Sequence, residues 1–129
     1  MDVNKHINYW LTSAESDIST AERMLLSGDY HWCLYISHLV IEKSLKAYYC
    51  KIVNDIPPRT HDLVKLAHMA KLELSPEQIL FYNKVNDFNI EARYPDEKFS
   101  FYKISTKEFA EENYNKIMAE FLWIKSLII

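Results

Sequence analysis

The chain has 129 residues, of which 49% are hydrophobic, 14% aromatic and 26% charged. This length suits one domain with a continuous core, and the apolar content excludes a disordered, solvated polymer. The formal net charge of -3 excludes a general attraction to nucleic-acid phosphates and leaves only a local basic patch open. One glycine and four prolines are too few for a many-turned sandwich or barrel. We therefore expect residues 1–129 to form a single helical domain.

The cysteines and the chain ends indicate in which cellular compartment the protein is expected. Cys33 and Cys50 lie on one expected helix, about 25 Å apart along its axis, so they cannot pair within it. The first ten residues show no secretory signal. The apolar residues 121–129 are interrupted by Lys125 and fall short of the roughly 20 residues that span a bilayer. We expect reduced thiols, a cytoplasmic protein and no membrane association.

Two long helices open the chain. The first is expected over 4–27, where apolar residues recur at steps of three and four. These residues are Ile7, Trp10, Ala14, Ile18, Ala21 and Leu25. Gly28 follows directly, where a left-handed C-terminal cap is easiest without a β-carbon. A second helix is expected over about 29–53, because this stretch has no glycine or proline and carries an apolar stripe. It is expected to be the central helix.

Shorter elements follow. Pro57 and Pro58 end the second helix, and Thr60 is expected to cap a short third helix reaching about residue 71. A serine cap, a first-turn proline and a first-turn acid open a fourth helix over about 76–90.

The last part of the chain is expected to be a loop and then a long helix. The segment 93–102 contains Pro95 and many aromatic residues, so we expect a loop packed on the body through Tyr94, Phe99 and Phe101. Ser105 and Glu108 have capping-box spacing and open the final helix. Its apolar stripe consists of Ala110, Tyr114, Ile117, Phe121, Ile124 and Ile128. Together the elements predict an all-α, up-and-down bundle of four to five helices, which alone says nothing about function.

Four motifs follow one another in a specific order. A first helix with Trp10, Ala14, Asp17 and Ala21 is followed by GDYHWCLYISHLVIEKSLKAYY, then PPRTHDLVKL, then EARYPD. This order resembles the HEPN family, named for higher eukaryote and prokaryote nucleotide-binding domains, over almost the entire chain. The resemblance implies a helical bundle that is usually a homodimer. It also implies a setting beside a small nucleotidyltransferase, commonly as a toxin–antitoxin module, although many members of this branch have no assigned activity.

Many HEPN domains are metal-independent ribonucleases, whose signature is an arginine followed after four to six residues by a histidine. The cation holds the scissile phosphate and the imidazole transfers a proton. Arg93 occupies the position that the resemblance implies, but the last histidine of the chain is His68. Arg23 and Arg59 lack a histidine at that spacing as well. The standard mechanism is therefore not expected. A ribonuclease would need the fold to bring another histidine, such as His61, to Arg93 as a substitute base.

Two charged residues on the second helix form a candidate site. Glu42 and Lys46 are four residues apart, with His38 one turn earlier. One interpretation is a polar strip facing a groove, in which Lys46 binds phosphate and Glu42 orients it or a partner group. The other is an ordinary pair on a solvated face, contributing about 0.2–0.5 kcal/mol. The sequence leaves both interpretations open.

The remaining candidates lie beyond the second helix. His61 and Asp62 begin the third helix, where structural capping is favoured, although His61 could approach Arg93. Arg93 and Tyr94 lie in a segment able to present a guanidinium to phosphate, or else Arg93 pairs with a nearby acid while Tyr94 packs. In related toxins the partner transfers nucleotide to a tyrosine near the motif, which makes Tyr94 and Tyr102 candidates by position.

Other ligands and partners follow from residue types. No histidine and carboxylate pair has metal-ligand spacing, and the lone glycine leaves no phosphate-binding loop, so neither a metal nor a cofactor is expected. The second helix carries more aromatic residues than one face can bury, which predicts a homodimer interface on it. These residues are Tyr30, Trp32, Tyr35, Tyr48 and Tyr49.

The expected function combines these points. We expect a dimeric nucleotide- or partner-binding module associated with a nucleotidyltransferase in a toxin–antitoxin setting, with no catalytic residue assigned. The alternative is a metal-independent HEPN ribonuclease that binds RNA and uses Arg93 with a non-standard base. The sequence favours the binding module, which is not an enzyme, over the ribonuclease.

Overall fold

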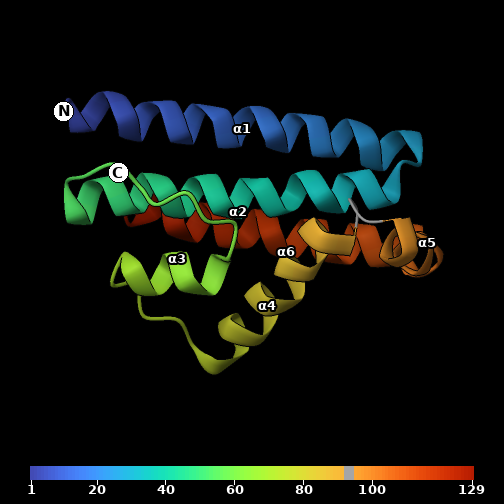
Figure 1. Ribbon diagram of the computed structural model, residues 1–129. Coiled ribbons are helices and arrows are strands. Elements are labelled where there is room, and N and C mark those ends of the chain that lie inside the picture. The colour runs from blue at the N-terminus through green and yellow to red at the C-terminus, as the bar shows by residue number, and fades with distance from the viewer. Residues whose placement is uncertain (92–94) are drawn as a thin grey trace.

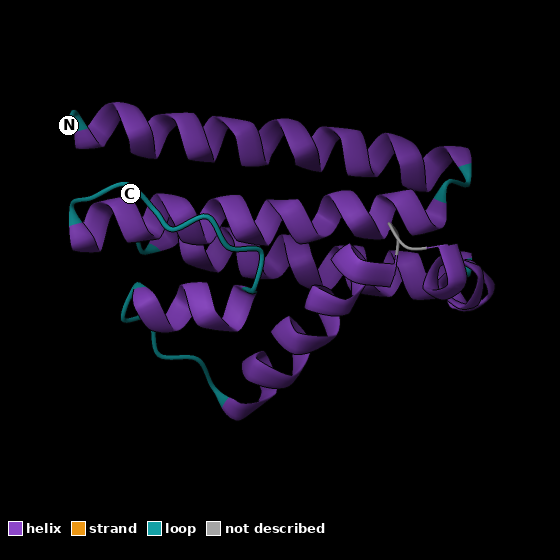
Figure 2. Ribbon diagram, in the orientation of Figure 1, coloured by secondary structure: helices purple, strands orange, loops and turns teal. Residues whose placement is uncertain are grey.

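The computed structural model describes residues 1–91 and 95–129, with side chains described for 1–90 and 100–129. This part of the chain contains six helices and no strand (Figures 1 and 2). The helices are α1 (Val3–Ser27), α2 (Tyr30–Val53), α3 (Leu63–Met69), α4 (Pro76–Glu91), α5 (Pro95–Ile104) and α6 (Lys107–Ser126). The predicted all-α bundle is confirmed, with one helix more than the sequence indicated.

The long helices α1, α2 and α6 run side by side along the bundle (Figure 1). Helix α2 contacts each of the other five helices, and many of its residues are buried. A helix that is apolar on most of its sides belongs in the centre of a fold. This confirms its predicted central position. None of the helices in 1–91 and 95–129 is both long and apolar enough to cross a bilayer.

Local capping explains where several helices begin and end. Gly28 follows α1 with a left-handed φ of 86°, as predicted, and its N–H donates to the Leu25 carbonyl oxygen. Asn54 ends α2 in the same left-handed region, at φ 60°. At α4, Gln78 N donates to Ser75 Oγ at 3.1 Å, and Ser75 N donates to Gln78 Oε1 at 2.9 Å. These reciprocal bonds form a capping box.

The predicted start of the third helix is wrong by two residues. The helix begins at Leu63, and its cap is Asp62, which accepts hydrogen bonds from Val64 N and Lys65 N. Thr60 Oγ1 instead accepts from Asp62 N at 3.2 Å, within the preceding turn. Aspartate and threonine both cap helices, so residue type alone could not choose between them.

The prediction of a loop over 93–102 is also wrong, because α5 covers most of that segment. Pro95 stands at the first position of this helix, where its missing N–H costs nothing and its fixed φ is favourable. Phe101 is buried as predicted and packs on Phe88, with ring centroids 5.6 Å apart. Tyr94 and the side chain of Phe99 lie outside the described residues.

Helix α6 is capped and anchored at its two ends. Its N-cap is Thr106, which accepts from Phe109 N at 3.1 Å, so the predicted cap at Ser105 is wrong by one residue. Near its C-terminal end, Lys51 Nζ of α2 donates to the Ile128 carbonyl oxygen at 2.6 Å. This bond ties the end of α2 to the residues that follow α6.

A partly buried group of hydrogen bonds joins α4 to α6. The Tyr82 hydroxyl donates to Glu120 Oε1 at 2.7 Å, and Gln78 Nε2 donates to the same oxygen at 3.0 Å. Burial of the ring, followed by the hydrogen bond to Glu120, raises the pKa of Tyr82 well above its ordinary value. Tyr82 therefore stays a neutral donor and holds α4 against the bundle.

The aromatic residues of α2 are less exposed than the predicted dimer interface required. All five of them are half-buried. More exposed apolar side chains lie on other elements, including Tyr9 and Leu26 of α1, Leu80 of α4 and Ile129 at the end of the chain. The exposed aromatic patch on which that prediction rested is therefore not seen on α2.

Candidate functional site

A buried carboxylate lies at the centre of a polar cluster. The side chain of Glu42 is 5% exposed, and its two oxygens have different partners. Lys46 Nζ donates to Oε2 at 3.1 Å, and His61 Nδ1 lies 2.7 Å from Oε1. The Lys46 ammonium also lies 5.1 Å from the centroid of the Trp10 ring. The cluster thus joins α1, α2 and the segment before α3.

His61 reaches this cluster because the helix ends at Asn54 and residues 54–62 run back along α2 (Figure 1). His38 Nε2 donates to the main-chain carbonyl oxygen of His61 at 2.9 Å. Both the main chain and the ring of His61 are therefore fixed to α2, by His38 and by Glu42. The His61 side chain is still 60% exposed.

The structure excludes one of the two interpretations of the Glu42–Lys46 pair that the sequence left open. The two side chains are only 5% and 10% exposed, so an ordinary pair on a solvated face is wrong. Burying an ion pair costs desolvation free energy, and removing one partner of a buried pair is strongly destabilising. The small energy of a solvated surface pair therefore does not apply to Glu42 and Lys46. Lys46 is held by Glu42 and by the Trp10 ring.

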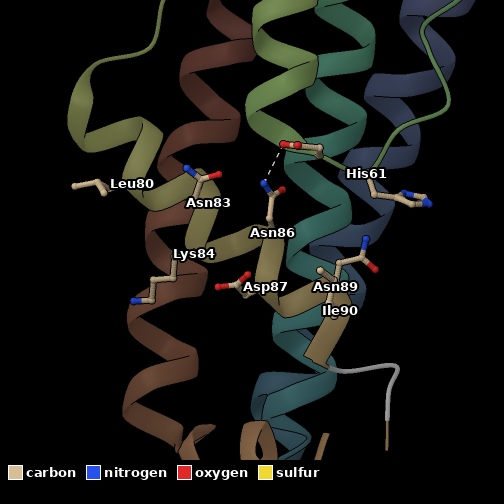
Figure 3. A pocket seen from close by; sticks show the side chains of 9 residues that line it. His61, Leu80, Asn83, Lys84, Asn86, Asp87, Asn89 and Ile90 are labelled. Carbon is tan, nitrogen blue, oxygen red and sulfur yellow. Dashed lines mark hydrogen bonds between the residues drawn. The ribbon is translucent and has the colours of Figure 1, made fainter. Parts of the chain in front are cut away.

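Asp62 has the structural role that the sequence favoured. Besides capping α3, its Oδ1 accepts from Asn86 Nδ2 at 3.1 Å, the dashed bond in Figure 3. Asn86 Oδ1 in turn accepts from Leu63 N at 2.9 Å. The one amide of Asn86 therefore bonds the first turn of α3 through both its donor and its acceptor, and fixes α3 against α4.

Replacing Asn86 with alanine is expected to lower the free energy of unfolding by about 1–3 kcal/mol, because it leaves the Leu63 N–H without its acceptor. Urea denaturation would measure the loss. Asn83 lies one turn earlier on α4 and is exposed, so Asn83→Ala is the matched control and should change stability by about 0.5 kcal/mol or less. Equal losses in the two variants would contradict the role assigned to Asn86.

A polar groove of about 690 Å³ lies between the start of α3 and the outer face of α4 (Figure 3). His61 and Asp62, just before α3, belong to its lining. Helix α4 contributes three asparagines, Lys84, Asp87 and two apolar residues. The groove thus has many neutral amide groups, and its carboxylates outnumber its ammonium groups. It can hydrogen-bond a polar ligand but offers little attraction to a polyphosphate.

The structure brings together three of the six sequence candidates, Glu42, Lys46 and His61. Asp62 follows His61 in the chain, but its carboxylate bonds Asn86 and the first turn of α3. Arg93 and Tyr94 lie outside the described residues, and Tyr102 is exposed on α5. Sequence reasoning missed Trp10 and Asn86 as parts of the site. Trp10 belongs to the apolar stripe of α1 and was counted as core, and nothing in the sequence marks Asn86.

Possible metal ligands and the two cysteine thiols are the other reactive groups of the described residues. No group of three or more histidine, cysteine, aspartate or glutamate side chains there is placed to hold a metal ion. Cys33 and Cys50 are free and buried. Burial raises the pKa of the Cys33 thiol to about 11, so it is protonated at neutral pH. A protonated, buried thiol is a poor nucleophile.

Comparisons with known proteins agree with this architecture. The profile described as the HEPN domain matches residues 7–127. The crystal structure of TT1696 from Thermus thermophilus has a TM-score of 0.77 at 19% identity, covering 93% of this chain and 96% of that one. ST0689, an archaeal HEPN homologue, has a TM-score of 0.71 at 22% identity, covering 95% and 98%. No curated protein matches significantly. At such identities the two structures show the shared fold alone.

Proposed function

The chain belongs to the HEPN domain family, and within that family we propose that it is a dimeric nucleotide- or partner-binding module. It would act in the cytoplasm with a nucleotidyltransferase, in a toxin–antitoxin setting. The observation that carries the proposal is the polar groove beside α4, with His61 anchored at its edge by Glu42. The missing arginine-to-histidine spacing supports binding over cleavage.

Nucleotide binding can be tested by filling the groove. Asn83→Trp places a large ring in it and spares the Asn86 bonds to α3, while Glu112→Trp on the exposed side of α6 is the matched control. Calorimetric titration with adenosine, guanosine, cytidine and uridine is expected to show binding of at least one by wild type and the control, because the groove can hydrogen-bond a nucleoside but attracts its phosphates little. Asn83→Trp should bind it about tenfold more weakly or worse, a loss of about 1.4 kcal/mol. Unchanged affinity would remove the groove from the proposal.

The assembly is tested separately. Sedimentation at micromolar concentration is expected to give a dimer, and co-expression with a minimal nucleotidyltransferase is expected to give a complex that copurifies. A monomer would contradict the first part of the proposal. Failure to copurify would contradict the second.

A second candidate, a ribonuclease, is favoured by one contact. His61 Nδ1 lies 2.7 Å from a buried carboxylate, an arrangement that orients imidazole bases in enzymes. Cleavage of a mixed RNA pool without metal would be compared between wild type, Arg93→Ala and His61→Ala. Cleavage that is lost in both variants would establish the ribonuclease. The absence of cleavage by all three would leave the binding module.

A further inference from the structure

The hydrogen bonds around His61 determine which of its ring nitrogens carries a proton. A carboxylate accepts hydrogen bonds and does not donate them, so Nδ1 is the donor in the 2.7 Å contact with Glu42 Oε1. Lys46 occupies the other oxygen of Glu42 and supplies the compensating positive charge. Among the described residues, nothing forms a hydrogen bond with His61 Nε2. In the neutral ring that nitrogen is an acceptor.

His61 lies where such an acceptor can meet a ligand. Its side chain is 60% exposed and lines the groove on the same side as Asn89 (Figure 3). The groove also contains the carboxylates of Asp62 and Asp87, with Lys84 as its only ammonium among the described residues. A phosphate dianion presents acceptors and negative charge, so it matches neither the Nε2 lone pair nor the two acids.

We propose that Glu42 is a positioning residue that holds His61 in its Nδ1–H form, which makes Nε2 a fixed acceptor for a neutral hydrogen-bond donor of the ligand. A hydroxyl, such as that of a nucleoside sugar, has this chemistry. The ligand part of the inference rests on the proposed binding function. The proton position does not, because it follows from the contacts within the chain.

Glu42→Gln reverses this arrangement while keeping the side-chain volume. The Lys46 ammonium only donates, so it orients the oxygen of the introduced amide toward itself. The NH₂ group then faces His61 Nδ1, which must accept, and the ring proton moves to Nε2. The groove loses its acceptor and gains a donor. A ligand that donates to Nε2 should bind about tenfold more weakly.

Nitrogen NMR of protein labelled at its histidine nitrogens tests the proton position, because protonated and unprotonated ring nitrogens have well-separated shifts. His61→Asn identifies the His61 signals by their loss, and a pH series separates the neutral ring from the imidazolium. His38 is an internal reference, because its Nε2 must carry a proton to donate to the His61 carbonyl oxygen. Glu112→Gln, at an exposed ion pair of the same spacing, is the control.

The expected result is an Nδ1–H ring for His61 in wild type and in Glu112→Gln, and an Nε2–H ring in Glu42→Gln. An Nε2–H ring in wild type, or the same form in both Glu42→Gln and wild type, would overturn the inference. The wild-type spectrum alone decides the proton position if Glu42→Gln does not fold.

A second set of spectra tests the ligand class, with adenosine, ribose and inorganic phosphate added separately to wild type. Adenosine is expected to shift the His61 signals more than inorganic phosphate does, and ribose indicates whether the sugar suffices. A larger effect of phosphate, or none from adenosine, would overturn the ligand class. A wrong proton position with intact nucleotide binding contradicts this inference only. The expected proton position without any nucleotide binding contradicts the proposed nucleotide function.

Discussion

Replacing Glu42 with leucine is expected to lower the free energy of unfolding by about 3–5 kcal/mol. The substitution leaves the Lys46 ammonium in a site where that side chain is only 10% exposed, without its carboxylate. It also removes the acceptor that holds the His61 ring against α2. An uncompensated charge in the interior costs far more than a lost surface ion pair. Urea denaturation of the two proteins would measure the difference.

The chain offers a matched control for this prediction. Glu112 and Lys116 form an ion pair of the same helical spacing on α6, with side chains 62% and 53% exposed. Glu112→Leu should change stability by about 0.5 kcal/mol or less. The double variant Glu42→Leu with Lys46→Met should recover most of the loss, because apolar residues often replace a buried pair at little cost. A loss from Glu42→Leu no larger than that from Glu112→Leu would contradict the prediction.

Phe101→Ala is expected to have an effect of similar size, about 3–5 kcal/mol. Phe101 on α5 is 1% exposed and packs on Phe88 of α4, so its removal leaves a cavity between these two helices. The size of this loss in the free energy of unfolding measures how much the packing of α5 on the core stabilises the fold. Thermal and urea denaturation would both detect it.

The neighbouring residue supplies the control for Phe101. Tyr102 is 66% exposed on the same helix, and Tyr102→Ala should cost less than about 1 kcal/mol. A small effect at Phe101, or equal effects at both positions, would show that this segment does not pack as described. The pair of substitutions therefore distinguishes a docked helix from the loop that the sequence indicated.

The long helices could be predicted closely because their signals are local. Apolar spacing marked the length of α1, and Gly28 marked its end. For α2, the absence of glycine and proline up to Val53 was sufficient to predict where the helix ends. At α5 the same reasoning failed, because Pro95 was taken as a helix breaker when it stands in the first turn. A proline alone does not tell these two positions apart.

The candidate site could be predicted only in part, because its decisive contacts join distant parts of the chain. The spacing of Glu42 and Lys46 was visible in the sequence, but their burial depends on how α1, with Trp10, packs beside them. The contact between His61 and Glu42 spans 19 positions and has no periodic signal. Asn86 bonds across 23 positions to Leu63, and asparagine is common on exposed helix faces. Contacts of this kind become visible only in the folded structure.

The short connection between α1 and α2 bears on the order in which the protein folds. These two long helices are separated only by Gly28 and Asp29 and pack side by side (Figure 1). Contacts between neighbouring segments require little loop closure, whereas the bond from Lys51 to Ile128 spans 77 positions. We therefore expect this helical hairpin to form first and α6 to dock later. Substitutions in the hairpin should slow refolding, and those on the inner face of α6 should mainly speed unfolding.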